Sequence, residues 1–540
     1  MKTDSPRRSR KAGFALVLVL AAGLRLWRIG FGLPALNDPD EPLFVMTALD
    51  MLRGHSLDPQ WFGHPATVLF YLLDLVLLAV GAIGRMLGQW HGAKGFVAAV
   101  FADPGVVILP MRLTMAACGV GCVALTERLG TRIGGARVGL VAALLLACNP
   151  LHIGISQLIR TDVLASLFML WSSLRALDLA EGAGWRAAVM AGVAAGLATA
   201  TKWPAVLVLA NVPGAVLAGR LPRWAVIVPP LVAGAVLLTV SPYLLLDHAT
   251  VLADLHGETR PGHLGSTGFG FGGNLWWYLV GPLAGSFGVV GLAAAALGAG
   301  VFVRRHARAA AAILPGAVVF LLAMAAQALV WERWIVPVLP AVALLAALGI
   351  KAAVQALPAR WRWPVTGAVA LALAAAMIGD ALAAARMRTH DTAQQASGWV
   401  LAHVAPRCSV LIEHAGFDLM RRPGPLLFPL GSAGCVDVRQ MLAQRPSYHH
   451  VEHLRTGRAI VDIGNVDPAR LGTCRADIAI LSHYSRYRAE AAQYPVQLAV
   501  YAALMAHGQT VARFAPVPGR SAGREIQVVT LSRAAHACLR

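Results

Sequence analysis

Residues 12–27 read AGFALVLVLAAGLRLW, and this apolar run decides how the rest of the chain is interpreted. It follows the basic residues Arg7, Arg8, Arg10 and Lys11, and no small-x-small cleavage pattern comes after it. We therefore interpret it as a retained signal anchor. Stretches of about 20 apolar residues, long enough to cross a hydrocarbon core of ~30 Å, recur along most of the chain. The sequence predicts an integral membrane protein that crosses the bilayer many times.

The composition agrees with this prediction. Apolar residues make up 57% of the 540 residues, charged residues make up 14%, and the mean hydropathy is +0.63. A soluble chain carries about 25% charged residues. The net charge of +19 would indicate a nucleic-acid partner in a soluble protein. Here the cations lie in short loops between spans, where they set topology, so we expect no nucleic acid as a partner.

The basic loops predict which side of the membrane each segment faces. They are residues 127–137, 175–186, 220–223, 304–308 and 351–362, and the N-terminus is basic as well. Basic loops are retained on the cytoplasmic side. All six can lie there only if residues 65–87 do not cross the membrane. We therefore expect these residues to lie in the outer interface or to re-enter it.

Placing all the basic loops on the cytoplasmic side predicts a polytopic α-helical membrane protein of about eleven spans, with a cytoplasmic N-terminus. The predicted spans are residues 12–30, 105–126, 138–158, 163–180, 187–203, 204–219, 224–242, 274–302, 309–331, 334–356 and 364–386. Together they form a transmembrane domain over residues 1–386. Its outer loops are residues 31–103, which include the interfacial helix, and residues 242–273.

Residues 387–540 are predicted to form a separate domain outside the cytoplasm, because hydropathy drops there. Helical and strand patterns alternate, which is typical of an α/β domain. The expected helices are residues 392–404 and 487–507, and the expected strands are residues 409–413, 459–463, 478–481, 510–514 and 526–531.

The cysteines divide between the two domains. Three lie in predicted spans, where we expect reduced thiols: Cys118, Cys122 and Cys148. Four lie in the outer domain: Cys408, Cys435, Cys474 and Cys538. An even number in an oxidising compartment permits two disulfides, and the sequence leaves three connectivities open. Buried free thiols are the alternative.

An acidic cluster follows the first predicted span on the outer side, in the run Asn37-Asp38-Pro39-Asp40-Glu41. Three carboxylates within four positions repel one another at a membrane surface. They need a cation, a basic partner or a proton-accepting role. In the alternative interpretation, Asp38 and Asp40 cap a helix that starts near Pro42, with Glu41 in its first turn.

Two further ionisable positions are expected at the same outer face. Arg160 and Asp162 end the third predicted span, where an interfacial ion pair and a helix cap are the structural alternative. Lys202 lies between two short spans and is the only lysine between Lys94 and Lys351, so it belongs to no basic loop. Its structural alternative is a lysine whose charged end reaches the membrane surface.

Weaker candidates complete the set. Arg112 starts the second predicted span, His64 opens the interfacial helix before Pro65, and Glu332 precedes Arg333 between two later spans. Each has a structural alternative as a local ion pair or interfacial residue. Taken together, carboxylates and cations would converge on one outer-face cavity. Cations suit a lipid phosphate, and a carboxylate suits deprotonation of an acceptor hydroxyl or amine.

With these motifs in order, the chain resembles a known family. The run Asp38-Pro39-Asp40-Glu41 is similar to the acidic signature of GT-C fold membrane glycosyltransferases. Within that group, the chain resembles the protein O-mannosyltransferase and lipid A aminoarabinose transferase branch (glycosyltransferase families 39 and 83). The resemblance covers roughly residues 20–350. It runs through Asp40-Glu41, His64-Pro65, Arg112, Arg160-x-Asp162, Lys202, and Arg333 followed by Pro337 and Pro340.

The resemblance implies a role for each matched residue. Asp40 would be the general base with Glu41 beside it, and Asp162 would orient the acceptor or a metal. The donor phosphate would contact Lys202, His64 and Arg333, together with Arg112, which would also hold the acidic network. The only metal hypothesis is a divalent cation at Asp162, and no nucleotide is expected.

The implied activity is that of an inverting glycosyltransferase. It would move a sugar from a polyprenyl-phosphate donor to an envelope lipid, glycan or protein on the outer face of the cytoplasmic membrane. Two alternatives remain. A secondary transporter predicts inverted repeats and ionisable residues near the bilayer midplane. In a non-catalytic envelope assembly protein, the acids would be structural and the outer domain would bind partners.

Overall fold

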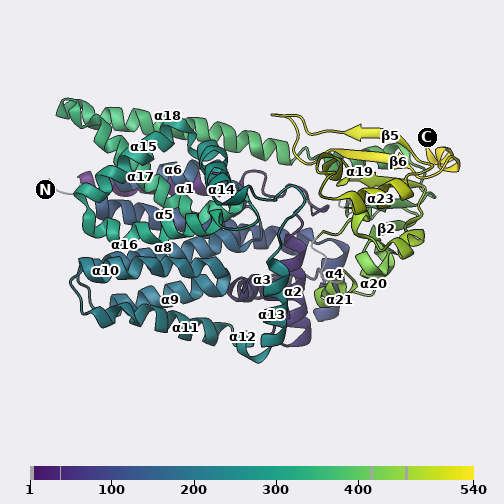
Figure 1. Ribbon diagram of the computed structural model, residues 1–540, viewed down its shortest axis with the longest axis horizontal. Coiled ribbons are helices and arrows are strands. Elements are labelled where there is room, and N and C mark those ends of the chain that lie inside the picture. The colour runs from purple at the N-terminus through teal and green to yellow at the C-terminus, as the bar shows by residue number, and fades with distance from the viewer. Residues whose placement is uncertain (1–4, 37, 414–416, 456–459) are drawn as a thin grey trace. The chain divides into compact units, whose positions relative to one another are not determined.

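The computed structural model describes residues 5–36, 38–413, 417–455 and 460–540 (Figure 1). The chain forms two compact units, which we describe separately. The first contains Met1–Ile29, Trp61–Leu72 and Met111–Leu382. The second contains Gly30–Gln60, Leu73–Pro110 and Ala383–Arg540. Two residues of predicted features, Asn37 and Ala459, lie outside the described residues.

The first unit is helical, as its long apolar stretches predict. Its elements are α1 (Ser5–Leu26), α5 (Gly105–Gly134), α6 (Ala136–Cys148), α7 (Pro150–Ser156), α8 (Thr161–Ala180), α9 (Trp185–Thr201), η1 (Trp203–Ala210), α10 (Asn211–Ala218), η2 (Arg223–Val226), α11 (Val228–Val240), α12 (Tyr243–Leu246), α13 (His248–Glu258), α14 (Gly270–Tyr278), η3 (Leu279–Leu283), α15 (Ala284–Arg305), α16 (Ala307–Ala325), η4 (Glu332–Val338), α17 (Leu339–Ala353), η5 (Val354–Ala356) and α18 (Ala359–Arg388). Helix α3 (Thr67–Met86) begins in this unit, whereas α2 (Glu41–Gly54) and α4 (Gly92–Ala102) belong to the second.

The helices confirm a polytopic membrane fold. Among the described residues, eight helices are long and apolar enough to cross a membrane, and the bent pair α6–α7 would make nine. Seven of the eight, together with the bent pair, coincide with predicted spans. The eighth is α3, which we predict not to cross. The remaining three predicted spans are helical too, but α9 has only 17 residues and η1–α10 covers only Trp203–Ala218. The number of spans therefore stays a prediction.

The third predicted span is not one straight helix. It breaks at Asn149 into α6 and α7, which meet at a bend of 62°. Pro150 lacks an amide hydrogen, so α6 cannot continue through it. The Asn149 side chain accepts a hydrogen bond from the His152 amide at 2.9 Å and starts α7 as a new helix.

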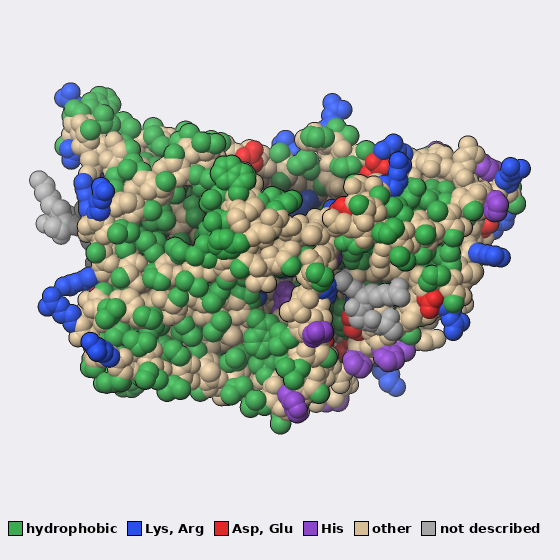
Figure 2. Space-filling view, viewed as in Figure 1, with side chains coloured by type: hydrophobic (Ala, Val, Ile, Leu, Met, Phe, Trp, Pro, Cys, Tyr) green, Lys and Arg blue, Asp and Glu red, His purple; other side chains and the backbone are tan. Residues whose placement is uncertain are grey.

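The basic loops of the first unit contact one another. Arg132, at the end of α5, forms ion pairs with Asp178 and Glu181 after α8. Lys351 donates to the Gly134 carbonyl at 3.0 Å. Figure 2 shows Lys and Arg side chains gathered at one end of the helical unit, beside an otherwise hydrophobic surface. The loops that these contacts join, residues 127–137, 175–186 and 351–362, thus lie together, as their predicted placement on one side of the membrane requires.

The residue before the chain first leaves the first unit, Ile29, contacts the start of the segment Met111–Leu382 of the same unit. Arg112, near the start of α5, donates to the Ile29 carbonyl, just past α1, at 2.8 Å. An odd number of membrane crossings between these residues is incompatible with that contact. This supports the prediction that α3 lies along the membrane rather than across it, although its length and hydropathy would allow it to cross.

The second unit contains a six-stranded sheet in the order β3-β2-β1-β4-β6-β5. The strands are β1 (Val410–Ile412), β2 (Leu426–Pro429), β3 (Cys435–Asp437), β4 (Ile478–Leu481), β5 (Gln509–Phe514) and β6 (Ile526–Thr530). Its helices are α19 (Thr392–His403), α20 (Val438–Ala443), α21 (Tyr448–Arg455), α22 (Tyr484–Ala489) and α23 (Pro495–Leu504), and its short turns are η6 (Phe417–Leu419), η7 (Gly431–Ala433), η8 (Ile463–Asn465), η9 (Pro468–Cys474) and η10 (Ala534–Cys538). We call residues 383–540 the sheet domain.

Strands β2, β1 and β4 are parallel, and the other three pair antiparallel. The α/β prediction and four of the five expected strands are confirmed. Helix α2 packs on the sheet domain, where Asp50 accepts a hydrogen bond from the Tyr448 amide at 2.5 Å.

Three details of the sheet domain differ from prediction. The expected strand at residues 459–463 is wrong in its described part, because Asp462 caps the turn η8 by accepting from the Asn465 amide at 3.0 Å. The expected helix at residues 487–507 is split into α22 and α23, since Pro495 cannot continue a helix from the preceding residues. Strands β2 and β3 were not expected, because prolines and glycines surround them.

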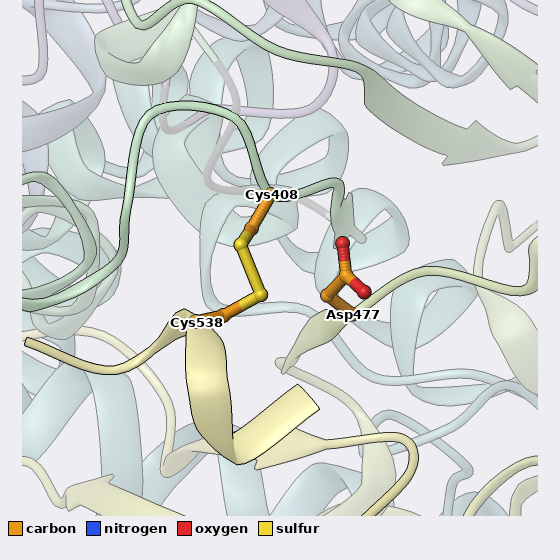
Figure 3. A group of neighbouring side chains, drawn as sticks. All are labelled: Cys408, Asp477 and Cys538. Atoms are coloured by element: carbon orange, nitrogen blue, oxygen red, sulfur yellow. A yellow bond between two sulfur atoms is a disulfide. The ribbon is translucent and has the colours of Figure 1, made fainter. Parts of the chain in front are cut away.

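The four outer-domain cysteines form two disulfides, Cys408–Cys538 and Cys435–Cys474, while the three cysteines in helices are free. Figure 3 shows Asp477 beside the first bridge. These three side chains form the only grouping of three or more metal-type ligands among the described residues. The two sulfurs are bonded to each other, and Asp477 accepts from the Ser409 amide and hydroxyl at 2.8 Å each. This grouping is therefore a structural bridge and not a metal site.

Candidate active site

A buried ion pair lies at the centre of the candidate site. Lys202 Nζ donates to Asp162 Oδ1, and the two residues are only 4% and 2% exposed. Asp162 lies in the first turn of α8, where a carboxylate complements the positive end of the helix dipole. Lys202 follows α9, which ends before Pro204. Because α8 and α9 are antiparallel neighbours, the start of one helix meets the end of the other.

Two arginines add positive charge to this pair. The charges of Arg160 and Arg333 both act on Asp162 and on Lys202. Arg160 immediately precedes α8, and Arg333 comes from η4. The Arg333 guanidinium also lies over the Trp331 ring, 5.0 Å from its centroid. One carboxylate and three cations therefore lie together at this end of the apolar bundle.

His64 joins the same site. Its Nδ1 lies 3.2 Å from Thr161 Oγ1, within hydrogen-bond distance, and its ring lies beside Trp61 with centroids 5.7 Å apart. The segment that carries His64 is fastened on both sides. The Phe62 amide donates to Asp254 at 2.6 Å, and the Phe62 carbonyl accepts from the Trp203 indole at 3.2 Å.

Asp254 and Trp203 thus hold the segment with His64 next to Lys202, which lies between α9 and η1. Neither residue was predicted to belong to the site. Both side chains bond to backbone atoms of Phe62, and such bonds leave no pattern in the sequence. The one available signal was that Asp254 is an acidic residue in the outer loop.

Arg112 is fully buried in α5 and holds the carbonyl of Ile29. In the described contacts it links the ends of two helices. Its assignment to the donor phosphate stays a prediction.

Asp40 and Glu41 belong to the second unit. Asp40 occupies the cap position of α2 without a side-chain capping bond, and Glu41 is the first helical residue and is fully buried. The Asp38 carboxylate accepts from the Asp40 amide at 3.0 Å, which closes a turn before α2 and is not a bond to an amide in its first turn. The catalytic roles of Asp40 and Glu41 stay predictions.

The donor set around Asp162 does not suit a divalent cation. Such ions take several oxygen ligands. In the described residues, Asp162 is engaged by an ammonium group and lies within the field of two guanidinium groups. This arrangement suits an anion, and no step below is routed through a metal.

Comparison with known proteins gives the following similarities. The family model described as dolichyl-phosphate-mannose-protein mannosyltransferase matches residues 93–245. No sequence of a curated protein matches the chain. Two crystal structures of ArnT from Cupriavidus metallidurans share its fold at 14% identity. The apo state has a TM-score of 0.55 and covers 97% of this chain and 99% of its own. The state bound to undecaprenyl phosphate has a TM-score of 0.54 and covers 97% and 98%.

A third similar structure is the archaeal oligosaccharyltransferase AglB from Archaeoglobus fulgidus, in complex with an inhibitory peptide and a dolichol-phosphate. It has 12% identity and a TM-score of 0.55, and the match covers 95% of this chain and 74% of that chain.

Proposed function

Because the chain has the fold of GT-C membrane glycosyltransferases, we propose that it transfers a sugar from a polyprenyl-phosphate donor to an envelope acceptor. The single observation that carries this proposal is the buried Lys202–Asp162 pair with Arg160 and Arg333 beside it. Cations gathered at one place in an apolar bundle are suited to the phosphate of a lipid.

The reaction is a single displacement with inversion at the sugar. A bond forms between the acceptor oxygen or nitrogen and the anomeric carbon, and the bond from that carbon to the phosphate oxygen breaks. The polyprenyl phosphate leaves with the electron pair. Lys202, Arg333 and His64 stabilise the developing charge, because fixed cations in a dry site are already oriented for it. Arg112 completes this donor set in the proposal.

Asp40 is the general base in this scheme. It takes the proton of the acceptor hydroxyl or amine as the new bond forms, and Glu41 lies beside it in sequence. Asp162 orients the acceptor and holds Lys202 in place. These assignments follow the order of motifs in the chain.

The comparisons support the class of donor. One similar structure is bound to undecaprenyl phosphate and another to a dolichol-phosphate, both of which are polyprenyl phosphates. Polyprenyl phosphate is therefore the ligand with which to test this chain. The acceptor is an envelope lipid, glycan or protein.

We also propose the orientation of the chain. The basic end of the first unit, with the N-terminus, faces the cytoplasm, and the sheet domain lies on the outer side. The contacts among basic loops support the first part, through the positive-inside rule. The two disulfides support the second, because such bridges persist in oxidising compartments.

The test compares three variants. Lys202→Ala should weaken binding of undecaprenyl phosphate to the purified protein at least tenfold, because charge-assisted hydrogen bonds contribute about 1.5–3 kcal/mol. Asp40→Asn should bind normally but abolish transfer, measured by mass spectrometry of envelope glycans in a complemented deletion strain. Lys351→Ala is the matched control, since Lys351 lies at the basic end. Wild-type affinity in Lys202→Ala contradicts the phosphate role, and wild-type transfer in Asp40→Asn contradicts the base.

A further inference from the structure

A buried asparagine that belongs to none of the predicted site motifs caps the C-terminal end of helix α16. Asn274 of α14 is fully buried. Its Nδ2 donates to the carbonyls of Ala325 at 3.0 Å and Gln327 at 2.8 Å, and its Oδ1 accepts from the Phe269 amide at 2.7 Å. Ala325 is the last residue of α16, so these carbonyls include the unpaired ones that every helix end leaves. Asn274 satisfies them with both of its donors.

The chain beyond this cap is held in a short antiparallel pairing. The Gly268 amide donates to the Ala328 carbonyl at 2.8 Å, and the Val330 amide donates to the Ser266 carbonyl at 2.9 Å. Gly268 leaves no room for a side chain, because a Cβ there would lie 2.7 Å from Asn274 Oδ1 and 2.8 Å from the Ala328 carbonyl oxygen. Asn274 and Gly268 therefore fix residues 328–330 together.

This fixed segment leads directly to the cationic site. Trp331 follows it, packs edge-on against the His263 ring with centroids 5.2 Å apart, and supports the Arg333 guanidinium on its face. The charge of Arg333 acts on Asp162 and Lys202. The position of this guanidinium thus depends on where residues 328–331 are held.

We propose that Asn274 is a positioning residue that sets the affinity of the site for a lipid phosphate by fixing the place of Arg333. This inference rests on the proposed function, because it assumes that Arg333 contacts the donor phosphate. A side chain that acts in this way has no effect of its own once the Arg333 guanidinium is removed.

The experiment is a double-mutant cycle on the full chain, with undecaprenyl phosphate as the probe. Asn274→Ala should raise the dissociation constant about tenfold, because it removes the hydrogen bonds that hold the segment. In the Arg333→Ala background the same change should have almost no further effect. Asn211→Ala is the matched control. Asn211 is also buried, and it binds the Gly316 amide at 2.7 Å and Ser173 Oγ at 3.2 Å elsewhere in the bundle.

Gly268→Ala is a second route to the same result, since it displaces the segment while Asn274 stays in place. It decides the matter if Asn274→Ala does not fold. Weakened binding in either variant, lost in the Arg333→Ala background, supports the inference. Wild-type affinity in both, or losses that add fully to that of Arg333→Ala, overturns it while the proposed function stands. Wild-type affinity in Arg333→Ala itself overturns the donor contact of that residue, and the inference with it.

Discussion

The stability of the sheet domain should fall as pH rises from about 4 to 7, because two acids are buried together in it. Glu413 follows β1 and Asp462 caps η8, and both are fully buried. Glu413 accepts hydrogen bonds from the amides of Ile463 and His483 at 3.1 Å each and from the Tyr501 hydroxyl. His483 Nδ1 lies 3.9 Å from an oxygen of each carboxylate.

The groups around this pair do not neutralise it fully. Arg524 contacts Nε2 of His483, and its charge also acts on both carboxylates. Asp462 also accepts from the Tyr487 hydroxyl at 2.9 Å. Burial first, and then the charge of Glu413, raise the pKa of Asp462 from 3.8 to about 7. Burial likewise raises the pKa of Glu413.

The sign follows from these raised pKa values. The folded domain keeps a proton on the pair at pH values where the unfolded chain has lost it. Between about pH 4 and 7 the unfolded state binds fewer protons, so stability decreases as pH rises. The rise in the pKa of Asp462 from 3.8 to about 7 corresponds to roughly 4 kcal/mol, with a slope of ~1.4 kcal/mol per pH unit for one proton. This is a large share of the ~5–15 kcal/mol that stabilises a typical domain.

Hydrogen exchange on the full-length protein measures this locally, in peptides that cover β1 and β4, after correction for the intrinsic exchange rate. Protection should fall by up to about tenfold per pH unit between pH 5 and 7. Asp462→Asn should flatten the dependence, because the amide is neutral at every pH. Asp467→Asn removes a carboxylate outside the cluster and should preserve the dependence. Protection that stays constant or rises with pH in the wild type would refute the reasoning.

Two other predictions concern the topology of the chain and the packing of its helices. A cysteine at exposed Ala93 should react with a membrane-impermeant reagent in intact cells, and one at exposed Ala183 should be protected; the reverse pattern would invert the proposed topology. Gly298→Ala should cost more than ~2 kcal/mol of stability and lower the yield of folded protein, because its Cβ would lie 1.8 Å from the Leu345 carbonyl oxygen of α17. Gly300→Ala, which meets nothing within 4 Å, is the control, and equal melting temperatures of the two variants would show that the helices separate freely.

The sequence allowed the spans to be predicted more reliably than the contacts between them. Long apolar runs locate helices, because only a helix satisfies its own backbone in lipid. Lys202 was recognisable because no other lysine lies near it in the chain. Its pairing with Asp162 was not predictable, because it depends on how α8 and α9 pack. Asn274 gave no signal, since its partners are backbone carbonyls 51 and 53 residues away.

In the sheet domain, local residue preferences predicted four strands and failed where proline and glycine are frequent. Pro429 lies within β2, and Gly434 precedes β3, so both strands looked like loop. Which cysteines pair could not be predicted either, because the pairing depends on the fold that brings them together.

The cations around Asp162 have a consequence for turnover. In the proposed reaction the lipid phosphate changes from a diester with one negative charge to a monoester with nearly two at neutral pH. Lys202, Arg160 and Arg333 attract the second species more strongly, so the spent carrier should bind more tightly than the loaded one. Release of the carrier, rather than transfer of the sugar, would then limit the rate. Added undecaprenyl phosphate should inhibit the enzyme. Removing one of these cations by substitution should slow transfer of the sugar and speed release of the carrier.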